Sequence, residues 1–120
     1  MAEHNEVGKQ GEAIAVRYLA NKGYKIVTQN WRYGKAEIDI IITFKDQIVI
    51  VEVKTRTSLE FENPKEAVTI LKQKRIVTAA DAFIKEQNID LDCRFDIVSV
   101  LIKGGKVEVE HIEDAFSPML

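Results

Sequence analysis

The chain lacks several features that would place it in a specialised class of protein. Cys93 is its single cysteine, so an intrachain disulfide is excluded and a reducing compartment is predicted. No stretch of the sequence approaches the ~18 apolar residues that span a bilayer. The N-terminal segment also lacks the apolar core of a secretory signal. We therefore expect a cytoplasmic protein with no membrane partner.

The sequence also lacks internal repeats, low-complexity stretches and any segment resembling an interdomain linker. Its 120 residues are 46% apolar and 30% charged, as in an ordinary globular protein. This length and composition predict a single domain covering residues 1–120. A basic excess is missing as well, because the net charge is −2, which by itself does not indicate a nucleic-acid-binding protein.

Positive charge is nevertheless concentrated in the middle of the chain. From Asp81 to the C-terminus acidic residues outnumber basic ones, whereas between Lys54 and Arg75 the balance is reversed. This distribution predicts a basic groove on one side of the molecule, and a solvated helix face is the alternative. The basic residues of the middle segment are Lys54, Arg56, Lys65, Lys72, Lys74 and Arg75.

Hydrophobic spacing predicts the first half of the fold. Apolar residues at helical spacing indicate an amphipathic helix over residues 3–21, with Gly23 as its C-cap. Residues 24–29 are rich in β-branched side chains and predict a first strand, followed by a loop over residues 30–35.

The second half contains two strong local signals. Asn63-Pro64-Lys65-Glu66 combines an N-cap residue, a proline at the first helical position and a capping-box glutamate, which predicts a helix from there to about residue 87. Residues 94–102 and 106–112 predict a hairpin around Gly104-Gly105, a pair typical of a type I′ turn. The expected fold class is α/β, with a mixed sheet flanked by helices.

Two dense apolar segments between these elements carry charges that a buried strand normally avoids. They are Glu37-Ile38-Asp39-Ile40-Ile41-Ile42 and Val49-Ile50-Val51-Glu52-Val53-Lys54. Segments this rich in Ile and Val are typical of strands covered on both faces. A turn at Lys45-Asp46 would make them an antiparallel hairpin.

This hairpin would bring the charges together. With Phe44 opposite Gln47, Asp39 lies opposite Glu52 and Glu37 opposite Lys54, with all four side chains on one face of the hairpin. Opposed Cβ atoms are roughly 5 Å apart, and two carboxylates at about that distance repel by roughly 3 kcal/mol at an effective dielectric near 20. A divalent cation would reverse the sign of this interaction, since hard cations bind carboxylate oxygens.

Asp39, Glu52 and Lys54 form the pattern D-x₁₂-E-x-K, which suits phosphodiester hydrolysis. A metal held by Asp39 and Glu52, Mg²⁺ or Mn²⁺, would neutralise phosphoryl oxygens and lower the pKa of the attacking water. Lys54 would orient that water or stabilise charge on the phosphate. The structural alternative is a charged sheet end, with a Glu37–Lys54 ion pair worth about 0–1 kcal/mol.

Other candidate residues have weaker signals. Glu12 lies at the edge of the first helix's apolar stripe, where it would either add a third carboxylate to a cleft or remain a solvated helix residue. Trp31 would either stack on a base or pack half-buried. His111 has no partner at ligand spacing along the sequence.

Together these motifs closely resemble the YraN-like family. The resemblance is carried by Gly11-Glu12-x-x-Ala15-x-x-Tyr18-Leu19 with Gly23-Tyr24, by Asn30-x-Arg32, by Ala36-Glu37-Ile38-Asp39-Ile40-Ile41, by Val51-Glu52-Val53-Lys54-Thr55-Arg56, by Pro64-x-Glu66-Ala67-Val68, by Lys72-x-x-Arg75-Ile76 and by Arg94-Phe95-Asp96-Ile97-Val98. These are small bacterial proteins regarded as predicted endonucleases. They are similar to Holliday-junction resolvases and belong to the restriction-endonuclease-like, PD-(D/E)xK superfamily.

The resemblance implies a restriction-endonuclease-like α-β-β-β-α-β core and a metal-dependent nuclease site at Glu12, Asp39, Glu52 and Lys54. It also implies that Lys72 approaches this site or the DNA backbone. One departure is visible, because Ala36 stands where the family usually has glycine, and alanine lacks glycine's freedom at positive φ.

The sequence as a whole therefore predicts a metal-dependent endonuclease that hydrolyses DNA, with branched DNA as a candidate substrate, in repair or recombination. Arg56, Lys72 and Arg75 are the expected phosphate contacts. A homodimer would let such an enzyme reach symmetric strands. The alternatives are a non-catalytic nucleic-acid-binding or repair-scaffold protein of the same fold, and an interaction module without any nucleic-acid role.

Overall fold

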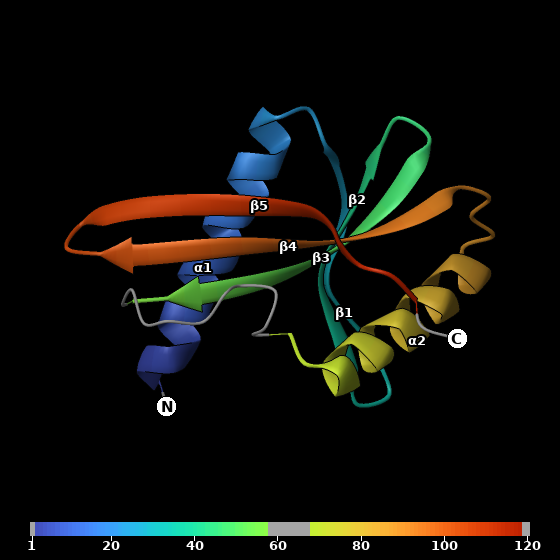
Figure 1. The fold of residues 1–120 in the computed structure, drawn as a ribbon, viewed down its shortest axis with the longest axis horizontal. Helices are drawn as coiled ribbons and strands as arrows, with labels where there is room; N and C mark the ends of the chain where they lie inside the picture. Colours follow the sequence, from blue (N-terminus) through green and yellow to red (C-terminus); the bar gives the residue numbers. More distant parts are fainter. Residues whose placement is uncertain (1, 58–67, 119–120) are drawn as a thin grey trace.

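The computed structural model describes residues 2–57 and 68–118. The chain order is helix, three strands, helix and two strands, as predicted (Figure 1). The elements are α1 (Ala2–Asn21), β1 (Lys25–Tyr33), β2 (Ala36–Phe44), β3 (Gln47–Arg56), α2 (Ile70–Glu86), β4 (Asp92–Lys103) and β5 (Lys106–Phe116). Within the described residues, neither helix is long and apolar enough to cross a membrane.

The five strands form one mixed sheet in the order β1-β2-β3-β4-β5. Strands joined by short turns pair antiparallel, whereas β3 and β4 are parallel and are connected across the sheet by α2. This confirms the α/β fold class, and the arrangement is consistent with a restriction-endonuclease-like core.

The two helices cover opposite faces of the sheet (Figure 1). The core on the α2 side contains Ile41, Ile50 and Phe83, and the core on the α1 side contains Leu19, Ile40 and Val51. Strands β2 and β3 contribute to both cores, which is why their sequences are nearly continuous runs of Ile and Val.

Local turn signals were accurate. Gly23 follows α1 at φ +93°, and the amide of Tyr24 donates to the carbonyl of Leu19, so the glycine ends the helix as predicted. The predicted two-residue turns are both present, with Phe44 paired to Gln47 and Lys103 paired to Lys106.

The prediction of a loop over residues 30–35 was wrong in part. Strand β1 continues to Tyr33, because Trp31 pairs with Ile38 and Tyr33 pairs with Ala36 on β2. β1 is an edge strand and is largely exposed. Its second half therefore lacks the dense apolar pattern of a buried strand, and its sequence resembles that of a loop.

The predicted start of the second helix was also wrong. The capping signal at Asn63-Pro64 lies outside the described residues, but Val68 and Thr69 are not helical, and α2 begins at Ile70. Thr69 is the N-cap, and its hydroxyl accepts a hydrogen bond from the amide of Lys72 at 3.2 Å.

Candidate functional site

The β2–β3 hairpin opens at the point where its charged residues begin. The register runs as predicted from Phe44–Gln47 to Ile40–Val51, where the pairing of β2 with β3 ends, one step short of Asp39 and Glu52. The carboxylate of Asp39 instead accepts a hydrogen bond from the backbone amide of Val53 at 2.8 Å. The amide of Val53 thus donates to a side chain at the point where the backbone pairing of the two strands has ended.

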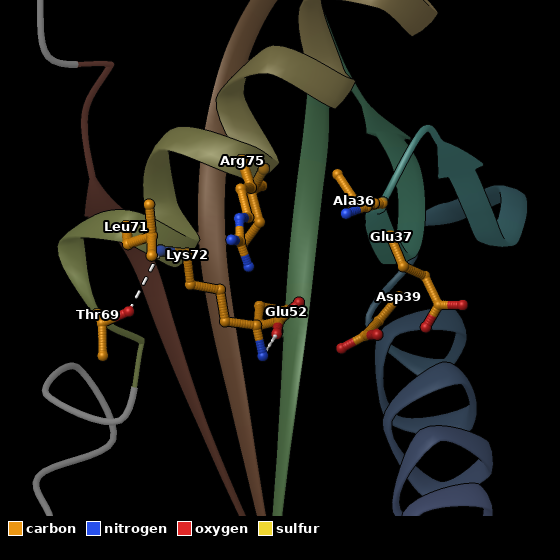
Figure 2. A pocket seen from close by; sticks show the side chains of 10 residues that line it. Ala36, Glu37, Asp39, Glu52, Thr69, Leu71, Lys72 and Arg75 are labelled. Carbon is orange, nitrogen blue, oxygen red and sulfur yellow. Dashed lines mark hydrogen bonds and ion pairs between the residues drawn. The ribbon is translucent and has the colours of Figure 1, made fainter.

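Asp39 and Glu52 line a cavity of about 360 Å³ between this end of the hairpin and the first turns of α2. Figure 2 shows Glu52 between Asp39 on β2 and Lys72 on α2, with Arg75 beside the same hollow. The other described lining residues are Lys35, Ala36, Glu37, Thr69, Leu71 and Ile76. Two predicted carboxylates and two predicted cations are therefore brought together.

The carboxylates form an electrostatically unfavourable pair. Glu52 is 4% exposed. Burial and the neighbouring charge of Glu52 raise the pKa of Asp39 to about 8, and the negative charge of Glu12 acts in the same direction. At neutral pH and without a bound cation, Asp39 therefore holds a proton.

A lysine partly offsets the charge of the buried carboxylate. The Nζ of Lys72 lies 2.5 Å from a carboxylate oxygen of Glu52. Burial alone would lower the pKa of Lys72, but the hydrogen bond and negative charge of Glu52 outweigh it and raise that pKa. The ammonium group of Lys72 therefore remains charged, and it occupies a position at Glu52 where the two carboxylates would also attract a metal ion.

Glu12 approaches the site from the other side of the sheet. It is half-buried, and its carboxylate accepts a hydrogen bond from the side-chain amide of Asn30 at 2.8 Å. The adjacent residue explains how α1 comes so close, because a Cβ added at Gly11 would lie 1.8 Å from the Oγ1 of Thr55 on β3. Glu12 is not among the described lining residues of the cavity, but its charge reaches Asp39.

Lys54 and Arg56 are placed further along β3. Side chains alternate, so Lys54 is on the same face of the strand as Glu52, but the described lining of the cavity does not include it. Arg56 donates to the hydroxyl of Ser99 at 3.5 Å and lines a separate hollow beside Glu108 and Glu110.

The alternative Glu37–Lys54 ion pair is not the arrangement found. Glu37 pairs instead with Arg32 across the β1–β2 turn, at 3.1 Å and near the surface. An exposed pair of this kind contributes about 0–1 kcal/mol. The ion pair between Glu37 and Arg32 therefore gives no structural role to Asp39 or Glu52.

The donor set suits a hard cation that retains water. Among the described residues no group of three or more His, Cys, Asp or Glu side chains is arranged to hold a metal ion. Asp39 and Glu52 supply two carboxylates, and Mg²⁺ is commonly bound through one or two carboxylates, water molecules and substrate phosphate. The residues present thus fit Mg²⁺ or Mn²⁺ better than a metal that needs a complete protein cage.

Sequence reasoning missed two contributors to the site. Lys35 lines the cavity, and Asn30 holds Glu12. It also missed a contact outside the described lining of the cavity, between His111 and a buried carboxylate, Asp96, at 2.7 Å. Asn30 was visible within a quoted motif but had no assigned partner. The His111–Asp96 contact joins strands β4 and β5, so spacing along the chain gave no signal for it.

Comparison with known proteins agrees with the resemblance. Residues 11–100 match the family described as "Uncharacterised protein family UPF0102", which is the YraN family. The chain belongs to this family. A UPF0102 protein of Bacteroides thetaiotaomicron is 50% identical over 120 residues, covering 100% of this chain and 99% of the relative. One of Phocaeicola vulgatus is 45% identical over 118 residues, covering 98% of each chain. These names state no activity for the YraN family.

Proposed function

We propose that this protein is a metal-dependent endonuclease acting on the phosphodiester bonds of DNA. The observation that carries the proposal is the pairing of a buried carboxylate, Glu52, with Asp39 inside a cavity whose other charged lining includes Lys35, Lys72 and Arg75. Two adjacent ionised carboxylates repel each other, and a divalent cation bound between them reverses the sign of that interaction. Cations around them attract a polyanion, and a phosphate backbone is one.

Each residue has a distinct role in this proposal. Asp39 and Glu52 would hold Mg²⁺ or Mn²⁺, which would neutralise phosphoryl charge and acidify a water molecule when bound. Lys72 and Arg75 contact the phosphate, and Lys54, on the same strand face as Glu52, orients the water or stabilises the developing charge. Glu12, fixed by Asn30, adds negative charge that favours cation binding. A cytosolic location and a homodimer that reaches symmetric strands belong to the same proposal.

The test is cleavage of single-stranded, duplex, flap and four-way-junction DNA with Mg²⁺ or Mn²⁺. Glu52→Gln should abolish cleavage, and Lys54→Ala should lower turnover by roughly 10²–10³-fold with little loss of affinity. Glu86→Gln, an exposed carboxylate near the end of α2, is the matched control and should cleave normally. Cleavage that persists in Glu52→Gln would overturn the proposal.

The second candidate is a non-catalytic DNA-binding or repair-scaffold protein. It is favoured by the absence, within the described residues, of a three-ligand metal cluster, and by the position of Lys72 against Glu52. This candidate predicts DNA binding that is equal in the wild type and Glu52→Gln, with no cleavage by either protein.

A further inference from the structure

A second hollow adjoins the cavity lined by Asp39 and Glu52, which we call the carboxylate cavity. Its volume is about 340 Å³, and it lies between the β1–β2 turn and one face of α2. Three residues, Lys35, Ala36 and Arg75, line both hollows, so the two form one continuous surface. We call the second hollow the aromatic groove; its remaining described lining residues are Tyr33, Gly34, Lys74 and Thr78.

The aromatic groove has a rigid ring at its edge. Tyr33 is 50% exposed, and its ring stacks on Trp31 with centroids 6.3 Å apart and planes 7° apart. Trp31 in turn contacts Phe83 of the α2-side core edge to face at 5.1 Å. Trp31, a candidate for base stacking, thus packs against the core, and Tyr33 is the exposed ring of the three.

The charges of the aromatic groove are of one sign. Its described lining contains the cations Lys35, Lys74 and Arg75 and no carboxylate, and all three side chains are exposed. An exposed aromatic ring beside cations that follow a groove is the arrangement that binds single-stranded nucleic acid, because bases stack on the ring while phosphates contact the cations. In a continuous duplex the base faces are already stacked on one another and cannot reach Tyr33.

We propose that Tyr33 stacks on an unpaired base of a DNA strand whose adjacent phosphates contact Lys35, Lys74 and Arg75. The strand then leads from the aromatic groove into the carboxylate cavity. This inference rests on the proposed function and narrows its substrate to DNA with unpaired nucleotides next to the reacting phosphate, such as a flap or a gap, in preference to continuous duplex.

Binding can be measured without cleavage in the Glu52→Gln protein. The probe is a single strand containing 2-aminopurine, whose fluorescence falls when the base stacks, compared with the same strand in a duplex. Tyr33→Ala should weaken single-strand binding about tenfold and remove the quenching, whereas Tyr33→Phe should retain both. Val27→Ala is the control, because Val27 is also exposed on β1 but lies outside the groove.

A second variant tests the phosphate contacts independently of the ring. Lys74→Ala should reduce the magnitude of the slope of log affinity against log salt concentration for single-strand binding by about 0.7. Lys106→Ala, at the β4–β5 turn, should leave it unchanged. The inference is wrong if Tyr33→Ala binds the single strand like its parent, if it weakens duplex binding equally, or if the parent does not bind single strands.

The outcomes separate this inference from the proposed function. If Tyr33→Ala cleaves DNA at the wild-type rate and with the wild-type substrate preference, the proposed role of the aromatic groove is wrong and the proposed nuclease function stands. If the protein binds single strands through Tyr33 but cleaves no DNA, the nuclease function is wrong and the role of the groove stands.

Discussion

In the proposed metal site, Asp39 couples cation binding to pH. Its pKa of about 8 means that a divalent cation arriving below that pH must displace one proton. We expect Mn²⁺ affinity to rise about tenfold per pH unit between pH 6 and 8 and then to level off. In Asp39→Asn the affinity should be lower and nearly independent of pH. Calorimetry at several pH values measures both, and equal affinity in the two proteins would contradict the assigned site.

The same carboxyl should make the cation-free protein less stable as pH rises. Its pKa is raised above the value of about 4 expected in the unfolded chain, so the folded state binds its proton more tightly. The contribution to stability is full below pH ~4 and is lost as pH rises toward 8. Asp39→Asn should therefore increase the free energy of unfolding at pH 8 and change it little at pH 4.

Lys72 occupies the position of a competing cation at Glu52. Replacing it by an uncharged side chain of similar length, Lys72→Met, removes repulsion of the incoming metal, and Mn²⁺ affinity should rise about tenfold or more. Lys74→Met is the matched control on the same helix, because Lys74 is exposed and absent from the described lining of the carboxylate cavity. Equal Mn²⁺ affinities in the wild type and both variants would show that Lys72 does not compete with the metal at Glu52.

At the scale of elements, the contact between α1 and β3 positions Glu12. A Cβ at Gly11 would overlap three side-chain atoms of Thr55, and a β-branched side chain has little rotamer freedom to move away. Gly11→Ala should therefore destabilise the protein by roughly 1–3 kcal/mol. Gly8→Ala should stabilise it slightly, since nothing lies within 4 Å of that position on the same helix. Urea unfolding distinguishes the two variants, and equal stabilisation by both would refute the close approach.

Strands β4 and β5 are joined by a buried polar cluster. Asp96 is fully buried and accepts hydrogen bonds from Arg94 at 2.9 Å and from the amide of Asp114 at 3.0 Å, and it contacts His111. Burial alone would raise the pKa of Asp96, but these donors outweigh it and lower the pKa.

Removing this charge should be costly. Asp96→Asn leaves Arg94 without its buried partner, and we expect a loss of roughly 3–5 kcal/mol at pH 7. Because the pKa of Asp96 is lowered in the folded state, its contribution is present above pH ~4 and is lost as pH falls through the folded pKa. The difference between wild type and variant should therefore shrink in acid. A constant difference down to pH 2 would contradict the role of the ionised carboxylate.

For the whole molecule, the proposed DNA binding by a chain of net charge −2 depends on where its cations lie. Lys72 and Arg75 lie at one cavity, while Arg56 lies beside Glu108 and Glu110. Duplex affinity should fall with salt, and Arg75→Ala should reduce the magnitude of the slope by about 0.9, as loss of one phosphate contact does. Arg56→Ala should reduce it less, because its neighbours are acidic. Slopes unchanged in Arg75→Ala would place DNA elsewhere on the surface.

The sequence by itself determined the features that depend on neighbours along the chain. Phe44 and Gln47 flank a two-residue turn, and that turn sets the register that carries Asp39 and Glu52 to the same end of the hairpin. The Ile and Val runs of β2 and β3 likewise required burial on both faces, because apolar side chains on alternating sides each need a covering layer.

Only the tertiary structure decided which distant groups meet. The ion pair between Lys72 and Glu52 depends on where α2 begins and how it packs on the sheet, and the capping signal at Asn63 misplaced that start relative to Thr69. The exposure of Tyr33 depends on β1 being an edge strand paired to β2. These contacts join residues far apart in sequence, so their energies depend on packing that no local pattern encodes.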